Sequence, residues 1–450
     1  MPFIVTKDTA TIEALAQEQA LEATIEIVPR NCKLKTYQSV TVPSFPVTGK
    51  VIAYASPDST FAVTKMLLDA AEKRIVIGMY DFTAGYVADL LKDALARGVR
   101  ITLMVDTDHV KGEDEIFKDL ATLGVVCVSA PSCASEKQSA HYFRSSHEKV
   151  IVIDDEICMI QSGNFSKNSI PLNLGDGVAN GVFRTGNRDM GIAVQSKTLA
   201  KFLVQVLKSD MQLELNAPED VEAALEIAAP PLLVEKAPSK GPSKLFPSKT
   251  FKLPGPLTVQ PVLSPDNYMR VVPEALRNAK QSVLIQQQYI HSADAPIAEL
   301  LAVIANARDE TQDFDIRILL GKIFDDKALA KERENLANMA ELYDLKIGRN
   351  IRYVDTTRFV HCHNKLIIID GKIVLVSSQN WSKAAVLENR EAGMLLTHKG
   401  VATYFTEIFE EDWKVGQTKL PSHIESGGVT PEALSAGGFV EVAAADYQQL

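Results

Sequence analysis

The amino-acid sequence predicts an α/β protein built from two similar lobes, and two observations support this fold class. Amphipathic segments with helical spacing alternate with short apolar segments that have the length and composition of strands. The same order of segments then occurs a second time along the 450 residues. Strand–helix–strand alternation favours parallel strands covered by helices, so each half is expected to form an α/β/α sandwich.

The individual elements follow the same order in both halves. In the first half we expect a helix, a strand, a helix and a strand at residues 60–73, 74–80, 86–98 and 99–106. In the second half the corresponding elements fall at residues 267–280, 282–289, 297–308 and 314–321. Each half is then expected to end in a β-hairpin that carries polar residues.

Short landmarks fix the correspondence between the halves. The tripeptide SPD at Ser56–Asp58 recurs 208 residues later, and GNRDMG at 186–191 corresponds to ENREAG at 388–393, 202 residues later. These landmarks divide the chain into a first lobe at 46–215 and a second lobe at 257–420. Residues 216–256 hold eight prolines and are expected to form a linker. Residues 1–45 and 421–450 are expected to be terminal extensions.

Composition limits the classes of partner. The apolar fraction of 46% and the charged fraction of 23% are typical of a globular enzyme. The formal charge of −10 argues mildly against a nucleic-acid backbone as the main partner. No apolar stretch approaches the roughly 20 residues that span a bilayer. The start of the chain lacks the pattern of a signal peptide.

The five scattered cysteines include no CxxC pair that would suggest a metal site. We therefore expect reduced thiols in a cytoplasmic protein. A secreted protein with a removed leader and a Cys127–Cys133 bridge is the alternative.

The expected hairpins carry the same four polar residues. In the first half, His147 and Lys149 precede one strand, and Ser162 and Asn164 follow the other. A two-residue turn at 155–156 would place His147 opposite Asn164 and Lys149 opposite Ser162. Side chains two apart lie on one side of a strand, so all four would share a surface.

In the second half, the turn at Gly371-Lys372 gives the same arrangement. The matching residues are His363, Lys365, Ser378 and Asn380. The alternation places Asp154 and Asp370 on the opposite side of their strands. We expect these two aspartates to hold turns or backbone amides.

Two such surfaces facing each other would suit a phosphodiester. The ammonium, amide and hydroxyl groups can hold the non-bridging oxygens without a metal. One neutral imidazole can attack phosphorus to form a phosphohistidine, while the other, protonated, gives its proton to the departing alcohol. A carboxylate behind a nucleophilic imidazole would fix its tautomer. Glu391 and Asp189 occupy matched positions for that role.

The segments "HEKVIVID…QSGN" and "HNKLIIID…SSQN" resemble the HxKxxxxD…(G/S)SxN signature of the phospholipase D superfamily, and the resemblance extends over roughly residues 50 to 415. It implies two α/β/α lobes related by a pseudo-twofold axis and an active site at their interface, with His147 as nucleophile and His363 as general acid/base. It also implies phosphate binding by the motif lysines and asparagines. Asp154 and Asp370 complete the signature and are therefore kept among the candidate catalytic residues.

The sequence departs from the family signature in two ways. Gln161 and Ser377 stand where glycine is common. The first acid, Asp189, is displaced by an insertion of 14 residues relative to Glu391. That insertion could form a loop beside the cleft that shapes substrate choice.

The leading hypothesis is a phosphodiesterase that cleaves phospholipid headgroups, or transfers the phosphatidyl group to an alcohol, without a cofactor. Its substrate would be a phospholipid at a membrane surface or dispersed. A DNA or RNA phosphodiesterase is the alternative, and it would need a basic groove, whereas the dense lysine run lies in the linker at 236–252. A lipid synthase and a non-catalytic binding protein are weaker alternatives. Because two internal copies complete the site, we expect a monomer.

Overall fold

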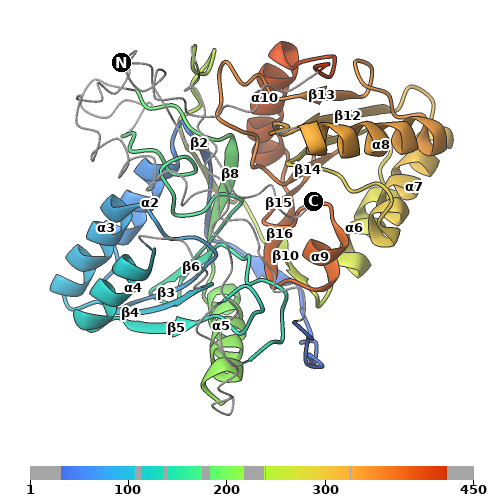
Figure 1. The fold of residues 1–450 in the computed structure, drawn as a ribbon. Coiled ribbons are helices and arrows are strands. Elements are labelled where there is room, and N and C mark those ends of the chain that lie inside the picture. Colours follow the sequence, from blue (N-terminus) through green and yellow to red (C-terminus); the bar gives the residue numbers. More distant parts are fainter. Residues whose placement is uncertain are drawn as a thin grey trace, which may run out of the picture.

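The computed structural model describes residues 32–106, 113–135, 140–174, 183–216, 238, 240–324 and 326–422. The two halves of the chain lie side by side, and each forms a twisted sheet with helices packed on it (Figure 1). Most of both expected terminal extensions, much of the linker and part of the insertion before Asp189 fall outside the described residues.

The first sheet has eight strands in the order β5-β4-β3-β6-β7-β8-β2-β9. Its strands are β2 (Lys50–Ser56), β3 (Arg74–Met79), β4 (Arg100–Val105), β5 (Val126–Ser129), β6 (Val150–Ile153), β7 (Ile157–Gln161), β8 (Asp189–Gln195) and β9 (Lys249–Lys252). The helices of this half are α2 (Thr60–Asp69), α3 (Gly85–Ala96), α4 (Glu113–Thr122) and α5 (Lys197–Leu215).

The second sheet has eight strands in the order β13-β12-β11-β14-β15-β16-β10-β1. Its strands are β1 (Phe45–Val47), β10 (Leu257–Ser264), β11 (Ser282–Gln287), β12 (Asp315–Leu320), β13 (Ile351–Tyr353), β14 (Leu366–Ile369), β15 (Ile373–Ser377) and β16 (Glu391–Thr397). The helices are α6 (Tyr268–Arg277), α7 (Ala295–Asp309), α8 (Asp326–Tyr343), α9 (Lys383–Leu387) and α10 (Lys399–Val415).

The two strand orders correspond element by element, and the expected α/β fold is confirmed. Among the named strands, parallel pairing is confined to β3-β4-β5 and β11-β12-β13. All other strand pairs are antiparallel. The edge strands are exchanged between the halves. Strand β1, at the boundary between the expected N-terminal extension and the first lobe, pairs with β10 of the second sheet, while β9, from the expected linker, pairs with β2 of the first. Each half therefore extends the sheet of the other.

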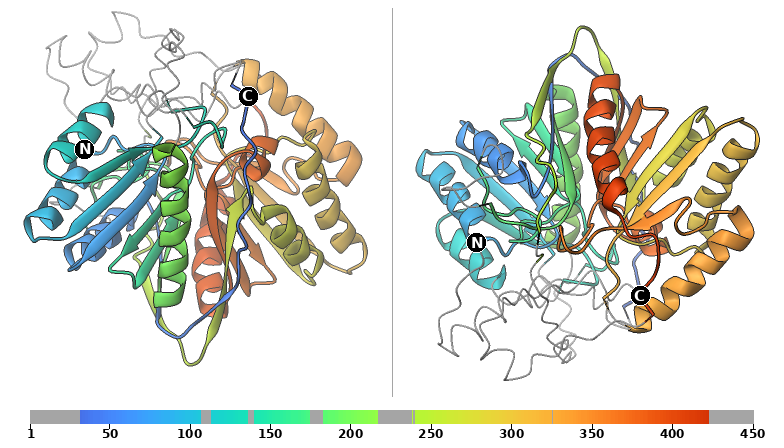
Figure 2. Two further views of the ribbon diagram at one scale, coloured as in Figure 1. Left: turned by 90° about the horizontal axis from the view of Figure 1, so that it is seen from below. Right: turned by 90° about the horizontal axis from the view of Figure 1, so that it is seen from above.

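Helices cover both faces of each sheet, which explains the apolar sequences of the motif strands. In β6, Val150 and Val152 belong to the core between the two sheets, whereas Ile151 and Ile153 belong to the core under α2 and α3. A strand buried on both faces reads as a continuous apolar run. Helices α5 and α10 lie in the central region between the sheets (Figure 2).

The hairpin register differs from the expected one by one residue. Ile153 pairs with Ile157, and Ile369 pairs with Ile373, so three residues rather than two connect each pair of strands. Asp154 and Asp370 adopt left-handed backbone angles, with φ of 53° and 52°. Asp and Asn tolerate this conformation better than most residues, so an extra turn residue fits at these positions.

The cysteines also differ from expectation. Cys32 and Cys133 form a disulfide, while Cys127, Cys158 and Cys362 are free. The expectation of a cytoplasmic protein depended on unpaired thiols, and a disulfide removes that support, since disulfides persist mainly in oxidising compartments. Among the described residues, no helix combines the length and apolarity needed to cross a bilayer.

Candidate active site

The motif histidines of the two halves lie next to each other where the sheets meet. Strands β7 and β8 contact β15 and β16 there. The ring centroids of His147 and His363 are 6.4 Å apart, and each residue is only 1% exposed. The structure therefore brings together two motifs that are 216 residues apart in the sequence.

Each histidine is hydrogen-bonded to an acid from the other half. Nδ1 of His147 donates to Glu391, with distances of 2.9 and 3.0 Å to its two oxygens. Nδ1 of His363 donates to Oδ1 of Asp189 at 3.0 Å. With Nδ1 engaged in this way, Nε2 is the ring nitrogen that can act on a substrate. The insertion before Asp189 does not displace it from the position that matches Glu391.

The environment of Asp189 favours its ionised form. Burial alone would raise the pKa of Asp189, but the positive charge and hydrogen bond of His363, together with the charge of Lys365, hold it below its ordinary value. The hydroxyl of Ser162 also donates to Asp189 at 2.7 Å and lowers the same pKa. A carboxylate that stays ionised stabilises a protonated imidazole beside it.

The motif serines form hydrogen bonds inside the protein. Ser162 accepts from the backbone N–H of Met190 at 3.0 Å, and Ser378 accepts from that of Ala392 at 3.0 Å. Each serine thus fixes the residue directly after the acid of its own half. The phosphate contact that we expected of both hydroxyl groups stays a prediction.

The motif lysines are fully buried beside the histidines. The ammonium groups of Lys149 and Lys365 each donate to the backbone carbonyl of the histidine two residues earlier, at 2.7 Å. Lys149 also lies over the ring of Tyr80, 5.1 Å from its centroid, and Lys365 donates to Oε1 of Gln288 at 3.4 Å. Two buried cations next to two imidazoles make a site suited to an anion.

Residues at the ends of β3 and β11 complete the site, and sequence analysis did not identify them. The ring of Tyr80 packs 4.7 Å from that of His147. Asp81 accepts a hydrogen bond from the amide of Asn164 at 2.7 Å, so this motif asparagine is oriented by a carboxylate. Asn380, its counterpart, is 1% exposed. Tyr80 corresponds to Gln288, 208 residues later in the repeat. This correspondence was the signal in the sequence that could have identified both positions as part of the site.

The signature aspartates lie outside the site. Asp154 accepts hydrogen bonds from the backbone N–H groups of residues 72, 73 and 74. Asp370 does the same for residues 280, 281 and 282. Both therefore join the hairpin turn to the start of the neighbouring strand, as their alternation predicts. Their inclusion among the catalytic candidates is not supported by this geometry.

The departure from glycine at position 161 has a structural explanation. Gln161 accepts a hydrogen bond from the hydroxyl of Tyr54 at 3.1 Å and donates to the carbonyl of Gly163 at 2.8 Å. The Tyr54 ring occupies the space where a side chain at Gly191 would lie. Gln161 is thus part of the packing behind the site.

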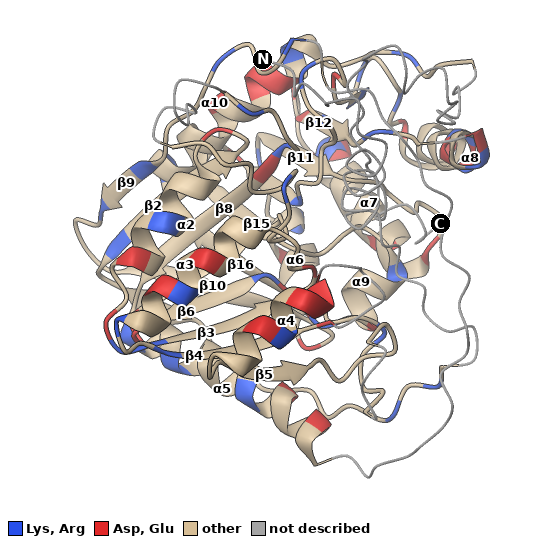
Figure 3. Ribbon diagram, turned by 60° about the vertical axis from the view of Figure 1, so that its left-hand side comes forward, with Lys and Arg blue, Asp and Glu red and all other residues tan. Residues whose placement is uncertain are grey.

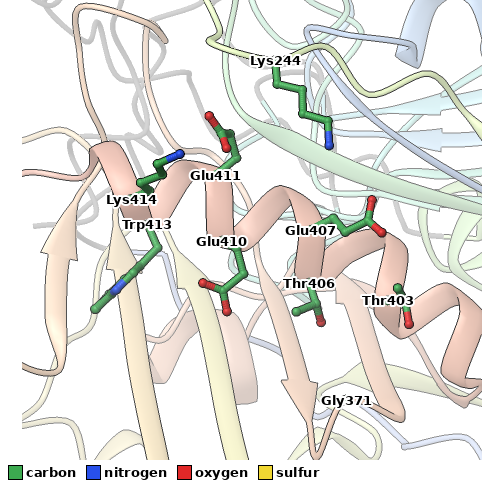
Figure 4. A pocket seen from close by; sticks show the side chains of 9 residues that line it. All are labelled: Lys244, Gly371, Thr403, Thr406, Glu407, Glu410, Glu411, Trp413 and Lys414. Atoms are coloured by element: carbon green, nitrogen blue, oxygen red, sulfur yellow. The ribbon is translucent and has the colours of Figure 1, made fainter.

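A separate surface pocket of 660 Å³ runs along α10 and includes none of the motif residues. Glu407, Glu410 and Glu411 of α10 line it together with Lys414 of the same helix and with Lys244 (Figure 4). A concentration of carboxylates disfavours a phosphate ligand. The buried histidine pair, and not this pocket, is the candidate active site.

Comparisons with known proteins agree with this arrangement. The family described as cardiolipin synthase, PLD-like domain, matches residues 65–211 and 272–413. The fold is similar to that of phosphatidylserine synthase from Haemophilus influenzae, with 14% identity, a TM-score of 0.56, and coverage of 88% of this chain and 93% of that one.

Two further structures match with lower scores. Nuc, a phospholipase D family member from Salmonella typhimurium, has 19% identity and a TM-score of 0.29 over 38% of this chain and 98% of that one. Polyphosphate kinase from Porphyromonas gingivalis has 10% identity and a TM-score of 0.47 over 89% of this chain and 55% of that one. No curated protein sequence matched significantly. Because the matched regions cover more than half of the sequence, with one motif in each, the chain belongs to the phospholipase D-like domain family.

Proposed function

We propose that this protein cleaves the headgroup phosphodiester of phospholipids through a phosphohistidine and passes the phosphatidyl group to water or to an alcohol. The observation that carries the proposal is the pair of buried imidazoles, 6.4 Å apart, each with its Nδ1 bonded to a carboxylate of the opposite half. Because each Nδ1 is engaged by a carboxylate, we infer that the two Nε2 atoms act on one phosphorus.

The first step is an attack by Nε2 of His147 on phosphorus. The P–N bond forms, the P–O bond to the leaving alcohol breaks, and the alcohol oxygen takes the proton from Nε2 of His363. Asp189 accepts the hydrogen bond from Nδ1 of His363, which leaves Nε2 of His363 to hold the proton that the leaving alcohol takes. Glu391 holds the proton on Nδ1 of His147, so that Nε2 carries the lone pair.

The second step regenerates the enzyme. Neutral His363 takes a proton from water or an alcohol, whose oxygen attacks phosphorus while the P–N bond to His147 breaks. Lys149 and Lys365 supply positive charge for the non-bridging oxygens in both steps. Hydrolysis and transfer therefore share one intermediate and differ only in the acceptor.

Charge supports a lipid rather than a nucleic-acid substrate. The formal charge is −10, and acidic and basic residues are interspersed along α2, α3 and α4 rather than forming a basic stripe (Figure 3). Asp81 adds a buried carboxylate beside Asn164, which disfavours a polyanion at that side of the site. A single phosphodiester with a neutral or cationic headgroup meets less repulsion.

The test is a side-by-side assay in EDTA of phosphatidylcholine and phosphatidylglycerol liposomes, bis(p-nitrophenyl) phosphate and single-stranded DNA, with and without added glycerol. We expect lipid turnover, inert DNA, and a phosphatidylglycerol product when glycerol accompanies phosphatidylcholine. Turnover of DNA with inert lipid would replace the proposal by a nuclease. The His147→Ala protein is the control for contaminating activity, because it lacks the proposed nucleophile.

A further inference from the structure

An arginine directly precedes the acid of each catalytic pair, and its side chain is buried. Arg390 precedes Glu391 and is 1% exposed. Its Nε and Nη2 contact both oxygens of Asp210 on α5, each at 2.8 Å. Its Nη1 contacts Asp266 at 2.5 Å and donates to the carbonyl of Ser264 at 3.1 Å. One guanidinium thus joins the two halves of the chain.

Arg188, which precedes Asp189, repeats this arrangement. Its Nε and Nη2 donate to both oxygens of Asp412 on α10, at 2.8 and 3.0 Å. Its Nη1 donates to Asp58 at 2.6 Å and to the carbonyl of Ser56 at 2.9 Å. We call each arginine with its two aspartates a clamp. In both clamps, one aspartate comes from the SPD tripeptide of the same half and the other from a helix of the opposite half.

The backbone of each arginine is hydrogen-bonded to the motif of the opposite half. The N–H of His147 donates to the carbonyl of Arg390 at 2.8 Å, and the N–H of Arg390 donates to the carbonyl of Ser145 at 2.8 Å. The N–H of His363 likewise donates to the carbonyl of Arg188 at 3.1 Å. In each pair, the arginine carbonyl therefore binds the backbone N–H of the histidine, and the carboxylate of the next residue binds the imidazole ring of the same histidine.

The chemistry of the clamps makes them rigid. In the Arg188 clamp the planar guanidinium forms two parallel hydrogen bonds to Asp412. In the Arg390 clamp, Nη2 donates to one oxygen of Asp210 and Nε forms an ion pair with the other at 2.8 Å. Both arrangements hold the guanidinium plane against one carboxylate, a geometry that lysine cannot reproduce. The three side chains of each clamp are at most 2% exposed, so loss of any one of them upsets the balance of buried charge. Such a group holds one geometry strongly, whereas an exposed ion pair would not.

We infer that Arg188 and Arg390 are positioning residues of the active site, each of which sets the carboxylate next to it against the histidine of the opposite half. The inference extends the proposed function to residues outside the motifs. It is specific in its direction: the Arg390 clamp serves His147, and the Arg188 clamp serves His363. If the arginines had only a structural role, their replacement would lower stability but would not affect one histidine and spare the other.

The first test needs no substrate. A hydrogen-bonded Nδ1–H of a buried imidazole gives a proton NMR signal downfield of the amide region, so two signals are expected. They are assigned by Glu391→Gln and Asp189→Asn. We expect Arg390→Lys to shift or broaden only the His147 signal, and Arg188→Lys only that of His363. If Arg390→Lys fails to fold, Asp210→Asn replaces it, and if Arg188→Lys fails to fold, Asp412→Asn replaces it. Asparagine keeps the shape of the aspartate that binds the arginine.

The matched control is Arg317→Lys. Arg317 on β12 also binds a carboxylate of α10 with two nitrogens, Glu410 at 2.7 and 2.8 Å, but it lies outside both clamps. It should leave both signals in place. Two unchanged signals in folded Arg390→Lys and Arg188→Lys proteins would overturn the inference, and so would equal changes of both signals in either variant.

The second test uses bis(p-nitrophenyl) phosphate, whose leaving group departs without a proton. Arg390→Lys should slow the first release of p-nitrophenol by about 100-fold, the typical effect of a small displacement of a reacting group. Arg188→Lys should leave that release within a few-fold of wild type and slow turnover of a lipid substrate. An equal loss in both steps for both variants would contradict the inference. If wild type shows no activity, the proposed function fails, while the NMR test still decides the role of the clamps.

Discussion

Glu391 and His147 belong to opposite halves of the chain, yet both carboxylate oxygens of Glu391 lie within 3.0 Å of Nδ1 of His147. Asp189 and His363 form the reciprocal pair. Neither half therefore contains a complete histidine–acid pair. If the proposed function holds, this exchange makes catalysis depend on the contact between the sheets.

Replacing the acids by amides tests the importance of the exchange. Glu391→Gln should lower kcat by about 10³- to 10⁴-fold, because an amide no longer holds the proton on Nδ1 and favours the wrong tautomer. Steady-state kinetics on whichever substrate the side-by-side assay shows to be turned over gives the measurement. Glu388→Gln is the matched control, since Glu388 lies three residues away and pairs with Arg144 and Lys383 at the surface. A Glu391→Gln protein within a few-fold of wild type would contradict the assigned role.

The signature aspartates should affect stability rather than chemistry. Asp154→Asn and Asp370→Asn keep a side chain that tolerates the left-handed backbone but remove the charge that accepts several backbone N–H bonds. We expect each change to lower the free energy of unfolding by about 1–3 kcal/mol, measured by urea denaturation. The kcat of the folded variants should stay near that of wild type. A large loss of kcat without a loss of stability would return these residues to the catalytic group.

The helices and central strands were predictable because their patterns are local. Amphipathic spacing at 86–98 corresponds to α3, and the apolar run at 74–80 corresponds to β3. The hairpin turns were predicted one residue too short, because the left-handed backbone of Asp154 and Asp370 is set by the N–H groups of distant residues that their carboxylates bind. The length of these turns therefore cannot be predicted from the sequence of the hairpin alone.

Long-range pairings were less accessible. The matched positions of Asp189 and Glu391 were visible in the sequence, but nothing in it indicated which histidine each would contact. The exchanged strands β1 and β9 are three and four residues long and have no alternating pattern. The pairing of these strands depends on the sheet edges that the other half offers. The disulfide between Cys32 and Cys133 likewise depends on the folded path of the chain, which brings the two residues together.

Glu148 should give the stability a characteristic pH dependence. Burial, and then the charge of Asp210, raise the pKa of Glu148 from 4.5 to about 7. Between these values the folded protein keeps a proton that the unfolded chain has lost. The contribution of Glu148 is therefore fully present below pH 4.5 and is lost as the pH rises through 7.

Glu148→Gln removes this titration. From pH 4.5 to pH 7.5, wild type should lose about 3 kcal/mol more of its free energy of unfolding than the variant does. Urea denaturation across this range gives the measurement, with Glu72→Gln at the surface as the control. Parallel pH profiles of wild type and Glu148→Gln would show that Glu148 does not titrate in this range.

The disulfide should contribute substantially to stability. It joins residues 101 positions apart, and a crosslink over such a loop typically stabilises the folded state by up to about 5 kcal/mol through the unfolded chain. Cys32→Ser should lower the denaturation midpoint to that of the reduced wild-type protein. Cys127→Ser is the control, because Cys127 is free. An unchanged midpoint for Cys32→Ser, or an additional effect of reductant on it, would argue against this pairing.

Trapping the covalent intermediate tests the central claim most directly, namely that the two histidines act on one phosphorus. The His363→Ala protein, mixed with bis(p-nitrophenyl) phosphate and quenched at high pH, should carry the p-nitrophenyl phosphoryl group on Nε2 of His147, as detected by mass spectrometry of its peptides. Loss of the general acid/base slows the release of this adduct but not its formation from an activated substrate. Absence of any adduct at His147 in a folded protein whose wild type turns this substrate over, or an adduct at another residue, would contradict the account.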